Sequence, residues 1–210
     1  TAIDDAVAEA TPHAGSVSAV VTSSDSNYGG LSLSPVSVAV SDNDTAGITV
    51  SPTAGLVTTE AGGTASFTVV LDTQPTANVS IGLSSSDSSE GTVAPISLGF
   101  TPANWNIAQT VTVTGVDDAI DDGDIAYSIV TAPASSADPN YDGLNAANVA
   151  VSNSDDDNAG ITVTPTAGLI TTEAGGTASF TVVLATQPTA NVSVGLASSD
   201  SSEGTAAPTT

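Results

Sequence analysis

Residues 63–83 read GTASFTVVLDTQPTANVSIGL and decide the expected fold of the chain. Apolar side chains stand at every second position from Ala65 to Leu71 and again from Val79 to Leu83. Because successive side chains of a β-strand point to opposite faces, each run predicts a strand with one buried face. The connecting segment contains Pro75 and several residues that favour turns. The stretch therefore predicts two consecutive strands of an all-β domain.

Similar runs lie on both sides of this stretch, separated by segments rich in Gly, Pro, Asn and Asp. Together they predict seven strands, at 48–50, 65–71, 79–83, 96–100, 111–113, 125–129 and 149–151. Seven short strands in about 110 residues are typical of an immunoglobulin-like β-sandwich. Trp105, in the segment TPANWN, is expected to anchor its loop against the sandwich, and Tyr28 and Tyr141 are expected to be packed.

The opening stretch lies within a longer repeat. The segment that begins AGITV at Ala46 recurs almost unchanged at Ala159, 113 positions later, and residues 1–45 align more weakly with 114–158. The chain is thus predicted to hold the C-terminal part of one repeat (1–45), a complete repeat (46–158) and the N-terminal part of the next (159–210). A repeat of this length has the size of a domain, so we expect tandem sandwiches arranged as beads on a string.

The charge balance restricts the possible partners. The chain has 23 acidic residues, no Lys and no Arg, and a formal net charge of -23. Without basic side chains to neutralise phosphates, we expect no nucleic acid partner, and without a run of about 18 apolar residues we expect no membrane insertion. We also expect no enzymatic activity, because the acidic clusters recur with the repeat and His13 is matched by Ala126.

Loop parity predicts that the acidic residues gather at one end. When successive strands of a sandwich run in opposite directions, their connections alternate between its two ends. Four connections of the same parity carry Glu60, Asp87 with Glu90, the acids of 117–124, and the acids of 155–157. We call the end that these connections share the exit pole, since the chain leaves the repeat there, and the opposite end the entry pole. Glu90 is expected to face solvent.

Crowded carboxylates need compensation. Two like charges 4 Å apart repel by about 4 kcal/mol at an effective dielectric constant near 20. Calcium fits such a site best, because it takes six to eight oxygen ligands in flexible geometry, whereas zinc prefers His and Cys. Magnesium remains an alternative, and so does a solvated acidic surface that serves solubility. A calcium site at this pole would clamp the junction between two repeats.

Three segments resemble a known family. TGVDDAIDDGD at 114–124, FTPANWNIAQTVTVTGVDD at 100–118 and DPNYDGLNAANVAVSNSDDD at 138–157 resemble Calx-beta domains, especially the tandem repeats of large calcium-dependent bacterial adhesins. The resemblance implies these calcium ligands in the complete repeat: Glu60, Asp87, Asp117, Asp118, Asp121 or Asp122, Asp155, Asp156 and Asp157. The repeat offset adds Asp4, Asp5, Asp42, Asp44 and Glu173 in the flanking units.

The expected function is structural. The pattern favours a calcium-rigidified spacer at the cell surface or in the extracellular space, in a bacterial adhesin, a surface layer or a fibre. Its partners would be adjacent repeats of the same protein, with self-association into fibres as a further expectation. The alternatives are a module that binds a ligand or glycan, and a filament subunit in which residues 159–210 and 1–45 of neighbouring chains complement each other.

Overall fold

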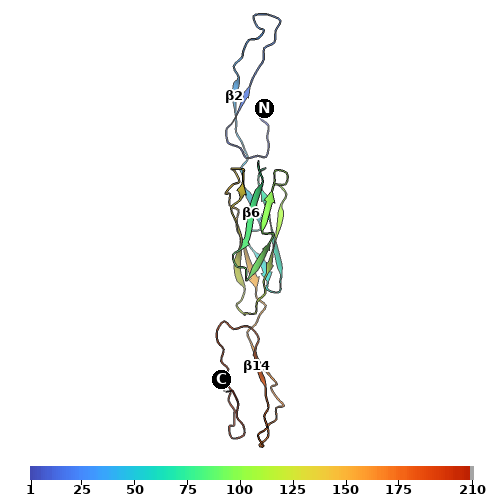
Figure 1. Cartoon of the computed structure of the whole chain (residues 1–210). Helices are drawn as coiled ribbons and strands as arrows, with labels where there is room; N and C mark the ends of the chain where they lie inside the picture. Colours follow the sequence, from blue (N-terminus) through green and yellow to red (C-terminus); the bar gives the residue numbers. More distant parts are fainter. Residues whose placement is uncertain (209–210) are drawn as a thin grey trace.

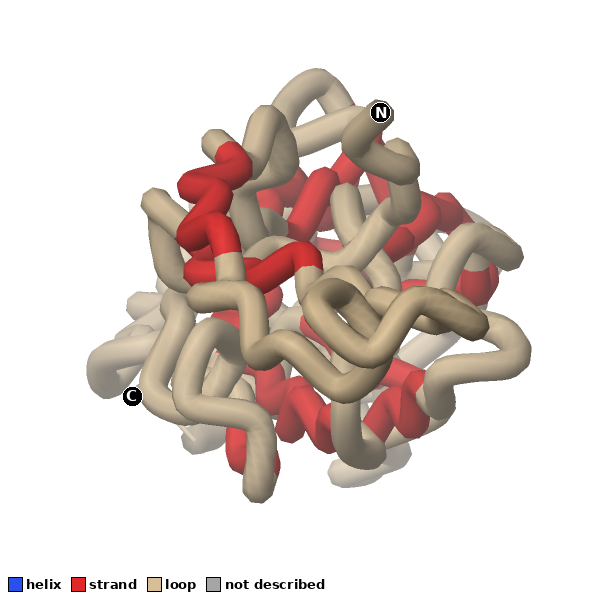
Figure 2. The backbone as a smooth tube through the Cα atoms, turned by 90° about the horizontal axis from the view of Figure 1, so that it is seen from above, coloured by secondary structure: helices blue, strands red, loops and turns tan. Residues whose placement is uncertain are grey.

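The computed structural model describes residues 1–208, which form an elongated molecule of three parts (Figure 1). A complete β-sandwich lies in the middle, with a two-stranded unit beyond each of its ends. Viewed down the long axis, the chain projects onto a compact outline, so the three parts lie in line (Figure 2). The described residues contain strands and no helix, as predicted, and therefore no helix long and apolar enough to cross a bilayer.

Two sheets face each other in the middle sandwich. One sheet contains β11 (Ser135–Ser136), β6 (Val79–Ser85), β10 (Ile125–Thr131), β12 (Val149–Ser154) and β4 (Leu56–Thr59), with β8 (Ser97–Phe100) also paired to β6. The other sheet has the order β3 (Ile48–Ser51), β5 (Thr64–Leu71), β9 (Gln109–Gly115) and β7 (Gly91–Ala94). All pairs are antiparallel except β12 with β4, which is parallel. This arrangement confirms the all-β, immunoglobulin-like fold class.

Alternating side chains form the core between the sheets, as the sequence predicts. Phe67 and Val69 of β5 pack in one cluster with Ile81 of β6 and Ile129 of β10, and all four are buried. Trp105 packs partly buried against this cluster, as expected. Ile96 was predicted to begin the strand at 96–100 as one of its apolar, inward positions, and this is wrong, since its side chain is 74 % exposed. Ile96 precedes β8, and its carbonyl accepts a hydrogen bond from Leu83 N at 2.8 Å while the side chain points to solvent.

Strands β4, β7 and β11 were not predicted. The first is the most consequential, because β3, the first predicted strand, ends before Pro52, and the chain then turns at Gly55, which has φ of 78°, into an unpredicted second strand. Proline interrupts strand pairing, and a positive φ suits glycine alone among common residues. After β3 the chain therefore no longer pairs with β5, and it crosses to the other sheet, where β4 pairs with β12. This crossing carries Glu60 to the end of β12, where Glu60 N donates to Ser154 O at 3.1 Å.

The two flanking units are hairpin-like and open. In the C-terminal unit, β13 (Ile161–Thr164) pairs with β14 (Thr181–Leu184) in the same register as β3 with β5. In the N-terminal unit, β1 (His13–Val17) pairs with β2 (Val36–Val40) one residue out of step with β10 and β12. Register is weakly specified where no buried face fixes it, and apolar side chains of both flanking units are exposed.

The two matched tyrosines differ for this reason. Tyr141 is 1 % exposed, whereas Tyr28 is 58 % exposed, so the prediction that Tyr28 is packed is wrong. The Tyr141 hydroxyl donates to Thr73 O at 2.7 Å and accepts from Thr73 N at 3.1 Å. The N-terminal unit contains no segment that matches Thr73, so Tyr28 has nothing equivalent to bond.

Substitution Tyr141→Phe should lower the free energy of unfolding of the middle sandwich by about 1–3 kcal/mol, because it leaves the buried Thr73 N–H without its partner. Urea denaturation followed by Trp105 fluorescence measures this change, since Trp105 is the single tryptophan of the chain and lies in the sandwich. Tyr28→Phe is the matched control and should leave the transition unchanged. Equal effects of the two substitutions would contradict the assignment.

Candidate metal centre

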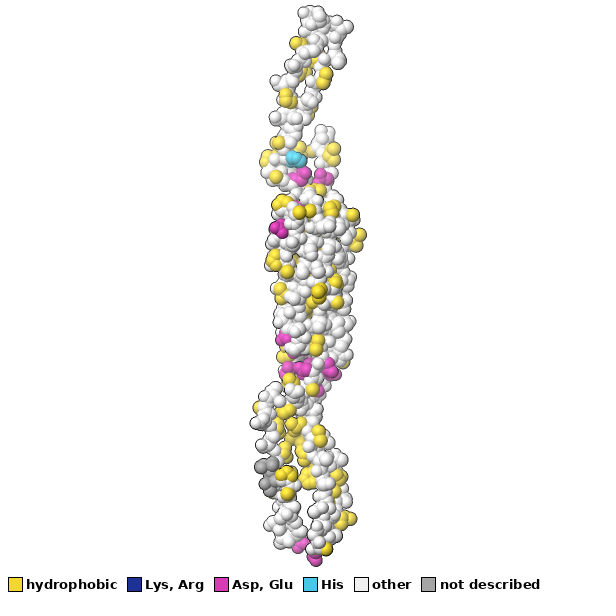
Figure 3. Space-filling model, viewed as in Figure 1, with side chains coloured by type: hydrophobic (Ala, Val, Ile, Leu, Met, Phe, Trp, Pro, Cys, Tyr) yellow, Lys and Arg dark blue, Asp and Glu magenta, His cyan; other side chains and the backbone are white. Residues whose placement is uncertain are grey.

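Acidic side chains from four separate segments converge on the exit pole. The segments are the end of β4, the connection from β6 to β7, the connection from β9 to β10, and the chain after β12. In the space-filling view, Asp and Glu side chains gather mainly at the two ends of the middle sandwich (Figure 3). The exit pole is the end that meets the C-terminal unit, as loop parity predicts.

Glu60 is the shared member of two carboxylate groups. Its oxygens lie within 4.8 Å of those of Asp117 and Asp156 in one group, and of Asp155 and Asp157 in the other. The Glu60 side chain is only 3 % exposed, because the parallel pairing of β4 with β12 places it beneath the chain that leaves the sandwich. Asp156 N donates to Glu60 Oε2 at 3.4 Å. The structure thus brings together five of the predicted ligands.

A third group combines Glu90 with Asp118 and Asp122, again with oxygens within 4.8 Å of one another. Glu90 is 6 % exposed, so the expectation that it faces solvent is wrong. Its backbone is fixed by Val116 N, which donates to Glu90 O at 3.0 Å. This bond joins the connection after β6 to the connection after β9, and it turns the Glu90 side chain toward the acidic loop.

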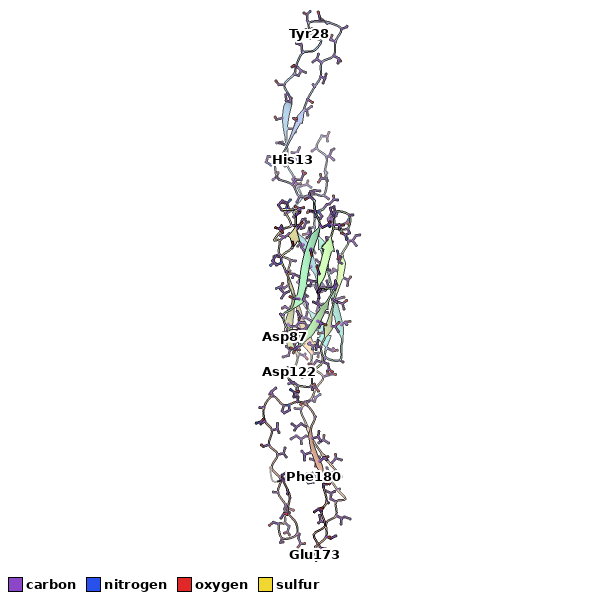
Figure 4. All side chains as sticks on the ribbon, in the orientation of Figure 1. His13, Tyr28, Asp87, Asp122, Glu173 and Phe180 are labelled. Atoms are coloured by element: carbon purple, nitrogen blue, oxygen red, sulfur yellow. The ribbon has the colours of Figure 1, made fainter. Side chains whose placement is uncertain are left out.

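Asp87, which the resemblance favoured as a ligand, lies outside the three groups. It lies near Asp122 at the same end of the sandwich (Figure 4), but its side chain closes its own turn. Asp87 Oδ1 accepts hydrogen bonds from the backbone N–H and the hydroxyl of Ser89, and these bonds lower the pKa of Asp87. Within this connection, Glu90 and not Asp87 faces the other carboxylates.

Between Asp121 and Asp122, which the sequence could not separate, the structure places only Asp122 in a group. Asp121 Oδ2 accepts a hydrogen bond from Ala159 N at 2.6 Å, and so joins the loop to the start of the next unit. Asp155 has a similar bridging position, because its Oδ2 accepts from Gly123 N at 2.7 Å. These two bonds connect the acidic loop to the chain that leaves the sandwich.

Asn153, which was not predicted as a site residue, organises the base of the pole. It is fully buried, its Nδ2 donates to Val116 O at 3.0 Å and to Glu90 Oε2 at 3.4 Å, and its Oδ1 accepts from Thr58 Oγ1 at 2.9 Å. A side chain at Gly115 would collide with Asn153 Oδ1. The sequence signal was present, because Asn153 continues the inward positions of Val149 and Val151 where an apolar residue is usual.

The exit pole has carboxylates but no basic side chain to balance them. Burial is the main cause that raises the pKa of Glu60 to about 7, and the charges of Asp155 and Asp118 add to it. Burial likewise raises the pKa of Glu90, and burial followed by the charges of Asp155 and Asp156 raises that of Asp157. Ionisation of these groups therefore destabilises the folded pole unless a cation is present.

These residues fit calcium by the chemistry of their donors. Every candidate donor side chain at the pole is an oxygen donor, which suits calcium and not zinc. Asp157 Oδ2 is buried and has no hydrogen-bond partner among residues 1–208, although buried polar atoms are normally paired. A cation held by Glu60, Asp155 and Asp157 would supply the missing partner and neutralise the charge.

The predicted ligands of the flanking units are only partly assembled. Asp42 accepts from Asp44 N at 3.2 Å, and the pKa of Asp44 is raised by burial and then by the charges of Asp42, Asp4 and Asp5. These four acids therefore meet at the first junction, but among the described residues they form no group as close as those of the exit pole. Glu173 lies at the far tip of the C-terminal unit, away from the other predicted ligands (Figure 4).

No family model matches the chain, and no curated protein matches it significantly. Among solved structures, the apo form of the Calx CBD1 domain has a TM-score of 0.41 at 18% identity, covering 52% of this chain and 96% of that one. The periplasmic chaperone SfaE has a TM-score of 0.41 at 9% identity, covering 52% and 58%. Domains 4 and 5 of the S-layer protein SbsC have a TM-score of 0.35 at 22% identity, covering 58% and 59%. The chain thus spans less than two thirds of the chaperone and of the S-layer fragment.

In chelator, the free energy of unfolding of the middle sandwich should fall as the pH rises from 5 to 8. A carboxyl whose pKa is raised by folding stabilises the protein below its unfolded value of 4.5, and this contribution is lost as the pH passes the folded value of about 7. Glu60→Gln should remove about 1–3 kcal/mol of this pH dependence. Urea denaturation read by Trp105 fluorescence tests it, and an unchanged pH profile in the variant would contradict the assignment.

The structure also predicts which acid of the connection after β6 matters for cation binding. Glu90→Gln should weaken calcium binding by roughly tenfold, because it removes a charged ligand worth about 1.4 kcal/mol or more. Asp87→Asn is the matched control, from the same connection, and should change the affinity by less than about twofold. Isothermal titration calorimetry of both variants provides the comparison. A larger loss with Asp87→Asn would favour the assignment drawn from the family resemblance.

Proposed function

We propose that this chain is part of a long extracellular structural protein, in which each sandwich acts as a spacer and calcium at its exit pole stiffens the junction to the next unit. The observation that carries the proposal is the convergence of carboxylates from four segments, with Glu60 buried among them and no Lys or Arg in the chain. Repulsion of this kind makes the folded pole depend on a cation.

The residues at the pole explain how binding would affect the junction. Glu60, Asp155 and Asp157 would hold one ion, and Glu90, Asp118 and Asp122 a second. The ion supplies positive charge and coordinates oxygen. The chain itself supplies the mechanical link, because Asp121 bonds to Ala159 N and Asp155 bonds to Gly123 N. Ordering the acidic loop therefore also orders the first residues of the next unit.

The shape of the molecule supports a spacer. The three parts lie in line, and the chain enters the sandwich at one end and leaves it at the other (Figures 1 and 2). A module of this kind lengthens a protein by one sandwich for each copy and places whatever follows it at a greater distance. A location at the cell surface or in the extracellular space agrees with this role and with the millimolar calcium found outside cells.

Self-association is a second candidate, favoured by the exposed apolar side chains of the flanking units. Phe180 of the C-terminal unit is 40 % exposed and Val36 of the N-terminal unit is 64 % exposed, although their counterparts in the middle sandwich, Phe67 and Val149, are buried in its core. Chains that covered these strands with one another would form fibres. Light scattering across a range of concentrations distinguishes this candidate, since a strict monomer at high concentration would exclude it.

Calcium at about 1 mM should raise the melting temperature of the middle sandwich by several degrees, since a ligand that binds only the folded state stabilises it by mass action. At a calcium concentration 100 times the dissociation constant, the gain is about 2.7 kcal/mol. Thermal melting followed by Trp105 fluorescence measures this shift, with magnesium and excess chelator as controls. Identical melting curves in calcium and in chelator would refute the proposal.

A further inference from the structure

The same main-chain contact occurs at both junctions of the molecule. Gln74 N donates to Ala6 O at 2.7 Å at the first junction, and Gln187 N donates to Ala119 O at 2.6 Å at the second. The donors are 113 positions apart, and so are the acceptors. Each donor lies in the segment TQPTANV, and each acceptor follows a pair of aspartates in the segment DDA. Two separate junctions therefore use one and the same pair of surfaces.

The first junction shows a second contact of the same kind. Asn140 Nδ2 donates to Ala8 O at 2.7 Å. Gln74 lies in the turn from β5 to β6, and Asn140 in the connection from β10 to β12, so two loops of the entry pole provide donors. Both acceptors are main-chain carbonyls of one loop of the preceding unit. The contact therefore depends on the backbone conformation of this loop, and no acidic side chain takes part in these hydrogen bonds.

The donor surface is built before any partner arrives. Thr73 and Thr76, on either side of Gln74, are held by the Tyr141 hydroxyl and by Asp138 Oδ2, the latter accepting from Thr76 N at 2.7 Å. Asp138 Oδ1 accepts from Asn140 N at 2.9 Å, and Asp138 is 2 % exposed. One buried carboxylate therefore fixes both donor loops, which lowers the entropic cost of docking.

The acceptor loop is also shaped locally, and in the same way at both junctions. Asp5 Oδ1 accepts from Val7 N at 2.9 Å, and Asp118 Oδ1 accepts from Ile120 N at 2.7 Å. Each bond closes a turn around the alanine whose carbonyl reaches the next unit. The second aspartate of each DDA segment therefore aims this carbonyl outward, toward the entry pole of the following repeat.

We propose that the entry pole, through Gln74 and Asn140 and organised by Asp138, is a docking surface whose partner is the Asp-Asp-Ala loop of the preceding repeat of the same protein. This inference rests on the proposed spacer function and specifies how consecutive spacers are joined. Because the Gln74 donor and the Ala6 acceptor recur at the second junction as Gln187 and Ala119, consecutive repeats can meet through the same contact at each junction.

The experiment measures the order of the first junction in the full chain. The chain contains no cysteine, so Ser16→Cys in the N-terminal unit and Thr112→Cys in the sandwich accept spin labels at two defined points. Electron–electron double resonance then reports the distribution of distances between them. We expect one narrow distribution in the otherwise unmodified chain. Asn140→Ala should broaden it, and Asn140→Asp, which replaces the donor by an acceptor, should broaden it at least as much.

Asn27→Ala is the matched control. Asn27 corresponds to Asn140, and its backbone N–H donates to Asp25 Oδ1 at 2.9 Å as that of Asn140 donates to Asp138 Oδ1. Among residues 1–208, however, no preceding unit contacts the loop that contains Asn27. This control should leave the distribution unchanged. Asn140 is exposed, and its backbone bond to Asp138 remains in every variant, so the sandwich should stay folded, which Trp105 fluorescence verifies.

Measurement in chelator and in excess calcium separates this inference from the proposed function. Broadening by both Asn140 variants under either condition supports the docking surface. Distributions that match the parent chain under both conditions overturn it. Calcium stiffening is tested separately, by the melting of the middle sandwich in calcium and in chelator, because the labelled junction lies at the entry pole and Asn140 contacts none of the carboxylates of the exit pole.

Discussion

A buried carboxylate without a basic neighbour is the constraint on which the exit pole depends. Glu60 reaches its buried position because the chain turns away from the first sheet after β3 and β4 pairs in parallel with β12. The buried side chain of Asn153 donates hydrogen bonds to Glu90 Oε2 and Val116 O, and so holds the Glu90 carboxylate at the exit pole as well. The fold thus concentrates negative charge at a point where the chain itself has no Lys or Arg to neutralise it.

The acidic loop between β9 and β10 contributes both carboxylates to the exit pole and a backbone carbonyl to the contact with the next unit. The carboxylates of Asp117, Asp118 and Asp122 face the pole, whereas the carboxylate of Asp121 and the carbonyl of Ala119 contact the next unit. A repeat built in this way can vary Asp122, a candidate ion ligand, without altering the Ala119 carbonyl that contacts its neighbour, whereas Asp118 contributes to both. The first junction illustrates this division, because Glu9 stands where the sandwich has Asp122, and yet Ala6 makes the same contact as Ala119.

Periodicity and parity account for most of what the sequence could predict. Alternation located the strands that form the core, and loop parity placed the acids at one end. Neither rule gives the direction of a side chain within a loop, and this is why Asp87 and Glu90 were interchanged: Ser89 captures the Asp87 carboxylate, and a backbone bond from Val116 fixes Glu90. The crossing at Gly55 and the role of Asn153 depend on contacts between segments far apart in the chain, which local patterns do not contain.

The turn around Asp25 has a consequence for how such a protein is made. Asn27 N and Tyr28 N bond to Asp25 in a unit that lacks a core, with the same partners that Asn140 and Tyr141 have around Asp138 in the complete sandwich. Each of these bonds joins residues two or three positions apart, so the turn can form locally as the chain is synthesised, before distant strands meet. A turn formed that early shortens the loop that must close before the last strand joins its sheet, so each sandwich can complete its folding soon after its final strand emerges.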